Sequence, residues 1–188
     1  MSGSDPSVRM PDWLFQRRDE SQWAVIHPDG RFSYSQLYQH AADFAAMLQE
    51  RGVQAGDRVA ILARHALVYA VTLHAARFVQ AILVPLNTRL SAVEIAWQVE
   101  DAEAHYIVCD SLHLALWQDA QKLTGRSLDV SIQDGLHWPQ VQHSLTPPWI
   151  ELERVQSLMY TSGTTGKPKG AMITYGNHFY GATASAFG

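Results

Sequence analysis

The sequence is poor in several residue types on which common functions depend. Cys109 is the one cysteine in 188 residues, which excludes an internal disulfide and a cysteine-rich metal site. Charged residues make up 17% and the net charge is −4, whereas an average globular protein is roughly 25% charged. The basic residues are scattered, so the basic stripe that nucleic-acid binding needs is missing. We therefore expect no nucleic-acid partner.

Long apolar segments are missing as well. No run of 18 apolar residues occurs, and the first eleven residues lack the apolar core of a signal peptide. We therefore expect no membrane partner and predict a cytoplasmic location. None of the nine histidines forms a His-x-x-x-His pair, and so we expect no structural metal.

Apolar segments of strand length alternate with segments of helical periodicity along most of the chain. Two capping boxes, Ser33 with Gln36 and Ser91 with Glu94, mark where helices begin. Strands separated by helices of ten residues or more predict an α/β fold with a mainly parallel sheet and helices on both faces. The predicted strands are 58–62, 81–84, 105–109, 154–160 and 171–174, and the predicted helices are 34–51, 66–79, 92–101, 112–122 and 177–187.

This pattern divides the chain into three parts. We predict a first α/β subdomain over 1–133, an irregular connecting loop over 134–150, and a nucleotide site over 151–188. The connecting loop contains Trp138 and Trp149, which are more typical of scattered exposed aromatics than of an interface.

Several single positions also carry expectations. Cys109 ends an apolar strand and is expected to be a small core residue rather than a nucleophile. Gln80 follows a predicted helix, and a left-handed cap would strain it, so we expect that helix to end in another way. The acidic residues Glu100, Asp101 and Glu103 are expected to form the solvated end of a helix.

Lysine is rare, and two of the three lysines, Lys167 and Lys169, lie in one short segment. Residues 160–170 combine four serine and threonine hydroxyls, three glycines and both lysines between two predicted strands. Glycine lets successive N–H groups point into one concavity, and lysine adds positive charge, so this composition is typical of an anion-binding loop. The spacing is not that of a Walker A loop, because only two residues separate Gly163 from Gly166. A hairpin turn with solvated lysines is the alternative.

The string from Tyr160 to Gly170 resembles, without a mismatch, the signature phosphate loop of the adenylate-forming superfamily. That superfamily includes acyl-CoA synthetases, peptide-synthetase adenylation domains and firefly luciferase. Residues 30–37, 84–91 and 101–103 are similar to the same superfamily. Within it, residues 87–91, Trp97-Gln98 and 174–179 are most similar to the o-succinylbenzoate-CoA ligases of menaquinone biosynthesis.

The resemblance implies an ATP-dependent acid–thiol ligase that forms an acyl-adenylate and then a thioester. ATP and Mg²⁺ would be its cofactors, coenzyme A its co-substrate, and a small aromatic or acyl carboxylic acid its substrate. It also implies that the chain is the incomplete N-terminal part of a large domain. Catalytic residues, the rest of that domain and a C-terminal domain are then expected beyond Gly188, and a homodimer is possible.

The resemblance places nucleotide binding in the loop. Hydroxyl and lysine side chains would contact the phosphates, and glycines would bring the backbone close. For Lys167, an outward orientation set by the neighbouring Pro168 is the alternative. The predicted binding residues are Thr161, Ser162, Gly163, Thr164, Thr165, Gly166, Lys167, Lys169 and Gly170. His178 follows the loop. It either lines a pocket for the acid or lies on the surface of a helix, and the sequence leaves both alternatives open.

Three alternatives remain open at this point. The enzyme activates a different acyl or aryl acid, or it transfers its acyl group to a carrier protein. In the third alternative the chain is a non-catalytic nucleotide-binding fragment, and we expect the 188 residues alone to be inactive even where the whole enzyme is active.

Overall fold

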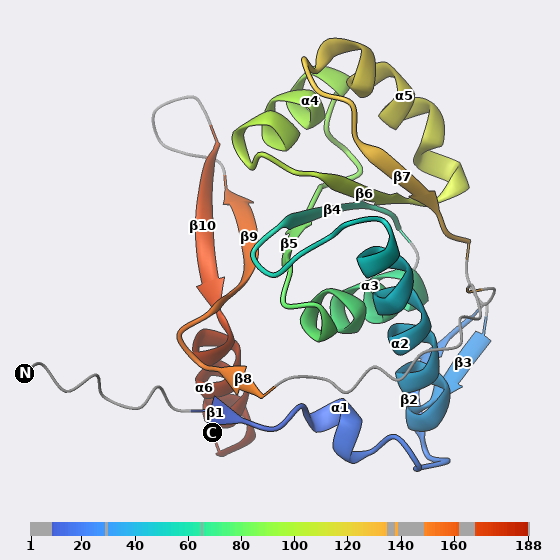
Figure 1. Ribbon diagram of the computed structural model, residues 1–188, viewed down its shortest axis with the longest axis vertical. Helices are drawn as coiled ribbons and strands as arrows, with labels where there is room; N and C mark the ends of the chain where they lie inside the picture. Colours follow the sequence, from blue (N-terminus) through green and yellow to red (C-terminus); the bar gives the residue numbers. More distant parts are fainter. Residues whose placement is uncertain are drawn as a thin grey trace, which may run out of the picture.

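The central feature of the computed structural model is a six-stranded sheet with the order β10-β9-β5-β4-β6-β7 (Figure 1). The structure describes residues 9–28, 30–64, 66–134, 138, 149–161 and 168–187. Neighbouring strands are parallel except for the antiparallel pair β9 and β10. The strands are β4 (Arg58–Leu62), β5 (Ile82–Pro85), β6 (Tyr106–Cys109), β7 (Asp129–Ile132), β9 (Val155–Thr161) and β10 (Lys169–Thr174).

Helices cover both faces of this sheet, which confirms the predicted α/β architecture. In β4, Val59 and Ile61 pack toward α2 (Tyr34–Glu50) and α3 (Ala66–Phe78). Ala60 and Leu62 pack toward α4 (Ala92–Asp101) and α5 (Leu114–Leu123) on the opposite face. Side chains alternate between the faces of a strand, so a strand buried on both faces is apolar throughout. In the view of Figure 1, α4 and α5 lie above the sheet and α2 and α3 below it.

Both predicted capping boxes are present. The backbone N–H of Gln36 donates to Ser33 Oγ at 3.2 Å, and the N–H of Ser33 donates back to Gln36 Oε1 at 2.9 Å. Ser91 and Glu94 make the same reciprocal pair at the beginning of α4. These caps satisfy N–H groups that have no partner within the helix, and so they fix where α2 and α4 begin.

Smaller elements escape the sequence prediction. All are two to five residues long, and most of them form separate two-stranded sheets or pack against α2 and α3. β1 pairs with β8 although about 140 residues separate them, and β2 pairs with β3 as a hairpin. β9 belongs to the same six-stranded sheet as β4, β5, β6 and β7. The predicted division of the chain into 1–133, 134–150 and 151–188 stays a prediction. The elements concerned are β1 (Arg9–Met10), α1 (Trp13–Gln16), β2 (Trp23–His27), β3 (Gly30–Ser33), a 3₁₀ turn (Ser111–His113), β7 and β8 (Ile150–Glu151).

Two sequence expectations were wrong. Gln80 does adopt the left-handed conformation after α3, with φ 57°. Its carbonyl accepts a 2.9 Å hydrogen bond from Gly56 N, while Ala81 N reaches back to Ala76 O at 2.9 Å, so the turn is held on both sides. Trp138 is buried rather than exposed, because its ring packs on Phe44 with centroids 5.0 Å apart.

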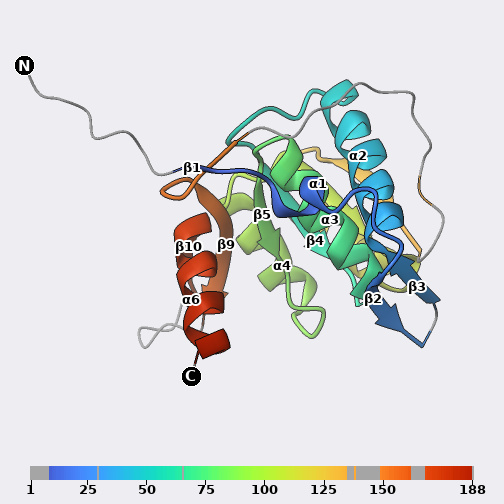
Figure 2. The same ribbon diagram turned by 90° about the horizontal axis from the view of Figure 1, so that it is seen from below.

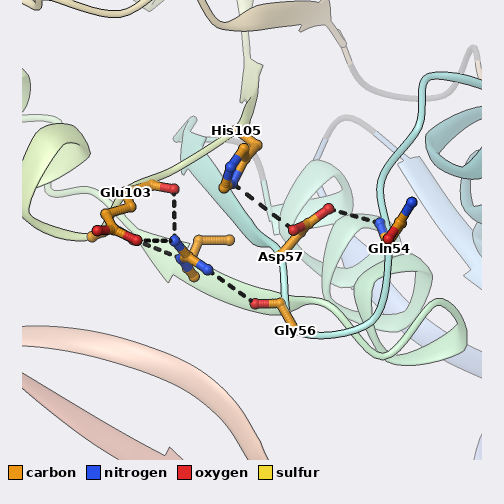
Figure 3. A network of polar contacts seen from close by, with 7 residues as sticks. Gln54, Gly56, Asp57, Glu103 and His105 are labelled. Carbon is orange, nitrogen blue, oxygen red and sulfur yellow. Dashed lines mark hydrogen bonds and ion pairs between the residues drawn. The ribbon is translucent and has the colours of Figure 1, made fainter.

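A network of polar contacts lies at the end of the sheet where the interior strands β4 and β6 begin (Figure 3). Arg58 Nε donates to Ala102 O at 2.7 Å, and its Nη2 binds Glu103 Oε2 at 2.7 Å. The guanidinium thereby takes up a carbonyl at the end of α4 that has no helical partner. It also holds Glu103, which has a φ of 51°, in a conformation unusual for its residue type. Figure 3 shows Asp57 between Gln54 and His105 beside this cluster.

Candidate functional site

The predicted phosphate loop joins β9 to β10, and these two strands form an antiparallel hairpin at one end of the sheet (Figure 1). Thr161 pairs with Lys169, and Tyr160 pairs with Gly170. Directly opposed residues in such a ladder lie roughly 5 Å apart. The fold therefore brings three predicted site residues, Thr161, Lys169 and Gly170, to the two ends of the loop. The other six, Ser162, Gly163, Thr164, Thr165, Gly166 and Lys167, lie outside the described residues.

Lys169 begins β10 and is exposed. Within the part of the chain that the structure describes, no carboxylate forms an ion pair with it. The other described lysine, Lys122, is paired with Asp119 at 2.8 Å on α5. An unpaired ammonium at the base of a glycine-rich loop is available to an anion, whereas Lys122 is already engaged.

Tyr160, at the other base of the loop, is tied to α4. Its phenol donates a 2.7 Å hydrogen bond to Asp101 Oδ2, and its ring meets the Trp97 ring edge to face at 5.8 Å. Burial, the hydrogen bond to Asp101 and the charge of that carboxylate raise the pKa of Tyr160. The phenol therefore stays protonated and remains a donor. This contact is not apparent from the sequence, in which Asp101 is predicted only as part of a solvated helix end.

Gly170 has a packing role that the loop composition does not reveal. A Cβ at this position would stand 3.0 Å from Leu158 Cδ1 and 3.4 Å from Tyr160 Cε1. Both atoms belong to β9, the strand paired with β10. Glycine therefore lets the side chains of Leu158 and Tyr160 lie close against the backbone of β10.

After β10 the chain turns directly into α6 (Tyr175–Phe187). Asn177 N donates to Thr174 Oγ1 at 3.1 Å, and Thr174 N donates to Asn177 Oδ1 at 2.9 Å. This reciprocal pair caps the helix as Ser33 and Gln36 cap α2. Figure 2 shows α6 beside β9 and β10, at the end of the molecule away from the β2–β3 hairpin.

A cavity of about 340 Å³ lies between α1, α3 and α6, and His178 contributes to its lining. One buried polar group in its lining is Arg77, whose side chain is 7% exposed and which forms an ion pair with Asp12 Oδ2 at 3.0 Å. Burial raises the pKa of Tyr175 in the same cavity to about 12, so this phenol is neutral. His178 thus lies both on the exposed surface of a helix and at the margin of a cavity.

Other candidate groups take no part in the site. Cys109 is fully buried at the end of β6, and burial raises the pKa of its thiol to about 12, which suits a core residue. Among the described residues, no three His, Cys, Asp or Glu side chains come together as a possible metal site. No helix in the described ranges is long and apolar enough to cross a membrane.

The family model for AMP-binding enzymes matches residues 14–187 of this chain. The chain belongs to the AMP-binding enzyme family. This confirms the resemblance to adenylate-forming enzymes that the loop predicts, and it accounts for nearly the whole chain. Among curated members of the family, 2-succinylbenzoate–CoA ligase of Geobacillus kaustophilus is 38% identical over 179 residues. An enzyme of the same name from Bacillus cereus is 33% identical over 184 residues.

Solved structures of the family share the fold. O-succinylbenzoate coenzyme A synthetase from Bacillus subtilis, in complex with ATP and magnesium ion, superposes with a TM-score of 0.81 at 27% identity over 96% of this chain. Its complex with the acyl-adenylate intermediate gives 0.78 at 27% identity over 96% of this chain. The two matches span 47% and 46% of those solved chains. The Geobacillus and Bacillus cereus relatives match 94% and 95% of this chain, which spans 35% of the length of each.

Proposed function

We propose that this chain carries the nucleotide-binding part of an ATP-dependent carboxylate–CoA ligase, and that the acid is o-succinylbenzoate in menaquinone biosynthesis. The observation that carries the reaction class is the β9–β10 hairpin, which sets Thr161 opposite Lys169 at the two ends of the signature loop. The choice of acid rests on the relatives, which are named as 2-succinylbenzoate–CoA ligases.

The reaction has two steps. The substrate carboxylate attacks the α-phosphorus of ATP, forming an acyl-adenylate and releasing pyrophosphate. The thiolate of coenzyme A then attacks the acyl carbon, forming the thioester and releasing AMP. Neither step requires a covalent bond to the protein, so catalysis depends on positioning and on stabilising charge.

The loop serves the first step by binding the β- and γ-phosphates. Hydroxyls of Ser162, Thr164 and Thr165 donate to phosphate oxygens, and backbone N–H groups at Gly163 and Gly166 add further donors. The Lys169 ammonium offsets charge that accumulates on the departing pyrophosphate. Mg²⁺, when bound with ATP, adds positive charge at the same oxygens. The described residues offer no acidic cluster for it, and we assign it no side chain.

Substitution of Lys169 tests this function. In the complete protein, Lys169→Ala should lower the rate of ATP–pyrophosphate exchange with o-succinylbenzoate by roughly 10- to 150-fold, because a hydrogen bond to a charged group is worth about 1.5–3 kcal/mol. Lys122→Ala is the matched control, since it removes the same side chain where it pairs only with Asp119. Equal exchange rates in the two variants would contradict the assignment of Lys169.

Substrate choice and assembly have their own measurements. Pyrophosphate release by the complete protein, compared across o-succinylbenzoate, benzoates and fatty acids, identifies the acid. Transfer to coenzyme A, compared with transfer to a carrier-protein thiol, identifies the acceptor. A homodimer remains a prediction, which sedimentation equilibrium of the complete protein tests.

A further inference from the structure

The loop end of the β9–β10 hairpin has little backbone support from the rest of the sheet. The registered pairing between β5 and β9 joins Leu83 to Ser157, four residues before β9 ends at Thr161. Beyond that point β9 pairs with β10, and β10 is the outer strand of the sheet. A two-stranded ribbon is marginally stable by itself, so other contacts must fix the direction in which this end points.

Side chains from α4 supply those contacts. Tyr160 is hydrogen bonded to Asp101 and packs against Trp97, and both partners lie on α4 four residues apart. Residues at this spacing share one face of a helix. A cleft of about 180 Å³ lies beside this contact, between the hairpin and the end of α4. Its lining includes Asp101, Glu103, Leu158 and Met172. The hydrogen bond between Tyr160 and Asp101 therefore lies at the border of this cleft, where the Tyr160 ring also packs against the core beneath α4 and α5.

The Tyr160 ring also lies against Gly170, near the other end of the loop. Gly170 lies opposite Tyr160 in the ladder, and any Cβ there would press on the Tyr160 ring and on Leu158. The Tyr160 ring is thus in contact with both strands of the hairpin and with α4. A change at its hydroxyl acts on Thr161 and Lys169 together, although neither of them touches Asp101.

We propose that Tyr160 and Asp101 are positioning residues for nucleotide binding: their hydrogen bond holds the hairpin so that the loop meets the β- and γ-phosphates of ATP. This inference rests on the proposed function. It predicts a specific effect on ATP, because AMP lacks the two phosphates that the loop binds.

The test compares ATP and AMP in the complete protein. Tyr160→Phe keeps the ring and removes the hydrogen bond. It should weaken ATP binding, measured by calorimetry, by about five-fold, which matches a net hydrogen bond of ordinary strength, and should leave AMP binding unchanged. Asp101→Ala should act like Tyr160→Phe, and the double variant should be no worse than either single variant. Asp101→Asn retains a carbonyl acceptor and should recover most of the affinity.

The control is Tyr38→Phe, which removes a phenol hydroxyl on α2, away from the hairpin. Unchanged ATP affinity in Tyr160→Phe, or an equal loss for ATP and AMP, would overturn the positioning role. The same outcomes leave the proposed function standing if the wild type shows o-succinylbenzoate-dependent exchange. Wild-type ATP binding without exchange would overturn the proposed function, and the comparison of ATP with AMP would still decide the positioning role. Failure of the wild type to bind ATP would overturn both.

Discussion

The buried ion pair between Asp12 and Arg77 should be among the most sensitive positions in this chain. Arg77 Nη2 lies 3.0 Å from Asp12 Oδ2, and the two side chains are 7% and 2% exposed. Asp12 Oδ1 also accepts hydrogen bonds from the N–H groups of Leu14 and Phe15, at 2.9 and 3.0 Å, and so caps α1. Arg77 Nη1 lies 3.3 Å from His74 Nδ1. The pair thus joins α1 to α3 through a desolvated contact.

Removing one partner leaves the other charge buried, which typically costs about 3–5 kcal/mol. Arg77→Met should lie near the lower limit, at about 3 kcal/mol, because Asp12 keeps its two backbone donors. Asp12→Ala should cost about 4–5 kcal/mol, since the helix cap, worth about 1 kcal/mol, is lost as well. The double variant leaves no buried charge and should cost far less than the sum.

Urea unfolding followed by tryptophan fluorescence measures these costs. Trp13 is a local reporter, because its ring lies 5.0 Å from the His74 ring and 5.7 Å from the Arg77 guanidinium. The expected coupling free energy between the two substitutions is at least about 2 kcal/mol. Single variants that each lose less than about 1 kcal/mol, or a double variant whose loss equals the sum, would show that the buried pair does not couple α1 to α3 in this way.

Two further predictions concern α3. Gln80→Gly should raise the free energy of unfolding by about 1 kcal/mol. Gln80 has a φ of 57°, and left-handed backbone is costly for residues other than glycine. A lower melting temperature in this variant would contradict the prediction. Burial, reinforced by the charge of Arg77, lowers the pKa of His74 to about 3, so the unfolded chain takes up a proton below about pH 6.5 that the folded chain does not. Stability should therefore fall by about 2 kcal/mol between pH 6.5 and pH 5, and urea titrations should show a smaller fall in His74→Asn; an equal fall in both proteins would exclude His74 as the cause.

The sequence predicts the helices and strands that are long and have a clear period. The capping boxes at Ser33 and Ser91 locate the beginnings of α2 and α4 because they are local signals that need no tertiary partner. β1 and β8 are different, since each is two residues long and exists only through a partner about 140 residues away. Gln80 was mispredicted because hydrogen bonds from neighbouring segments hold a backbone conformation that its residue type disfavours.

The place of the candidate site was predictable for a similar reason. The loop composition and its two flanking strands are consecutive in sequence, so the sequence alone locates Thr161 and Lys169 in one loop. The structure adds that they pair with each other, as the last residue of β9 and the first of β10. The bond between Tyr160 and Asp101 joins residues 59 positions apart and depends on how α4 packs against β9. The close approach of Leu158 and Tyr160 to Gly170 likewise depends on the register between the two strands and cannot be read from the sequence.

One local signal nevertheless bears on that distant bond. The capping box at Ser91 sets the first turn of α4, and ten residues from Ala92 to Asp101 extend the helix by about 15 Å. Trp97 and Asp101 then share the face that meets Tyr160, because they are four residues apart. A helix lengthened or shortened by one residue between Ser91 and Trp97 would rotate that face by about 100° and separate Asp101 from the phenol. The contact of Tyr160 with α4 therefore depends on a cap more than sixty residues before it in the sequence, through the length of the helix that carries Trp97 and Asp101.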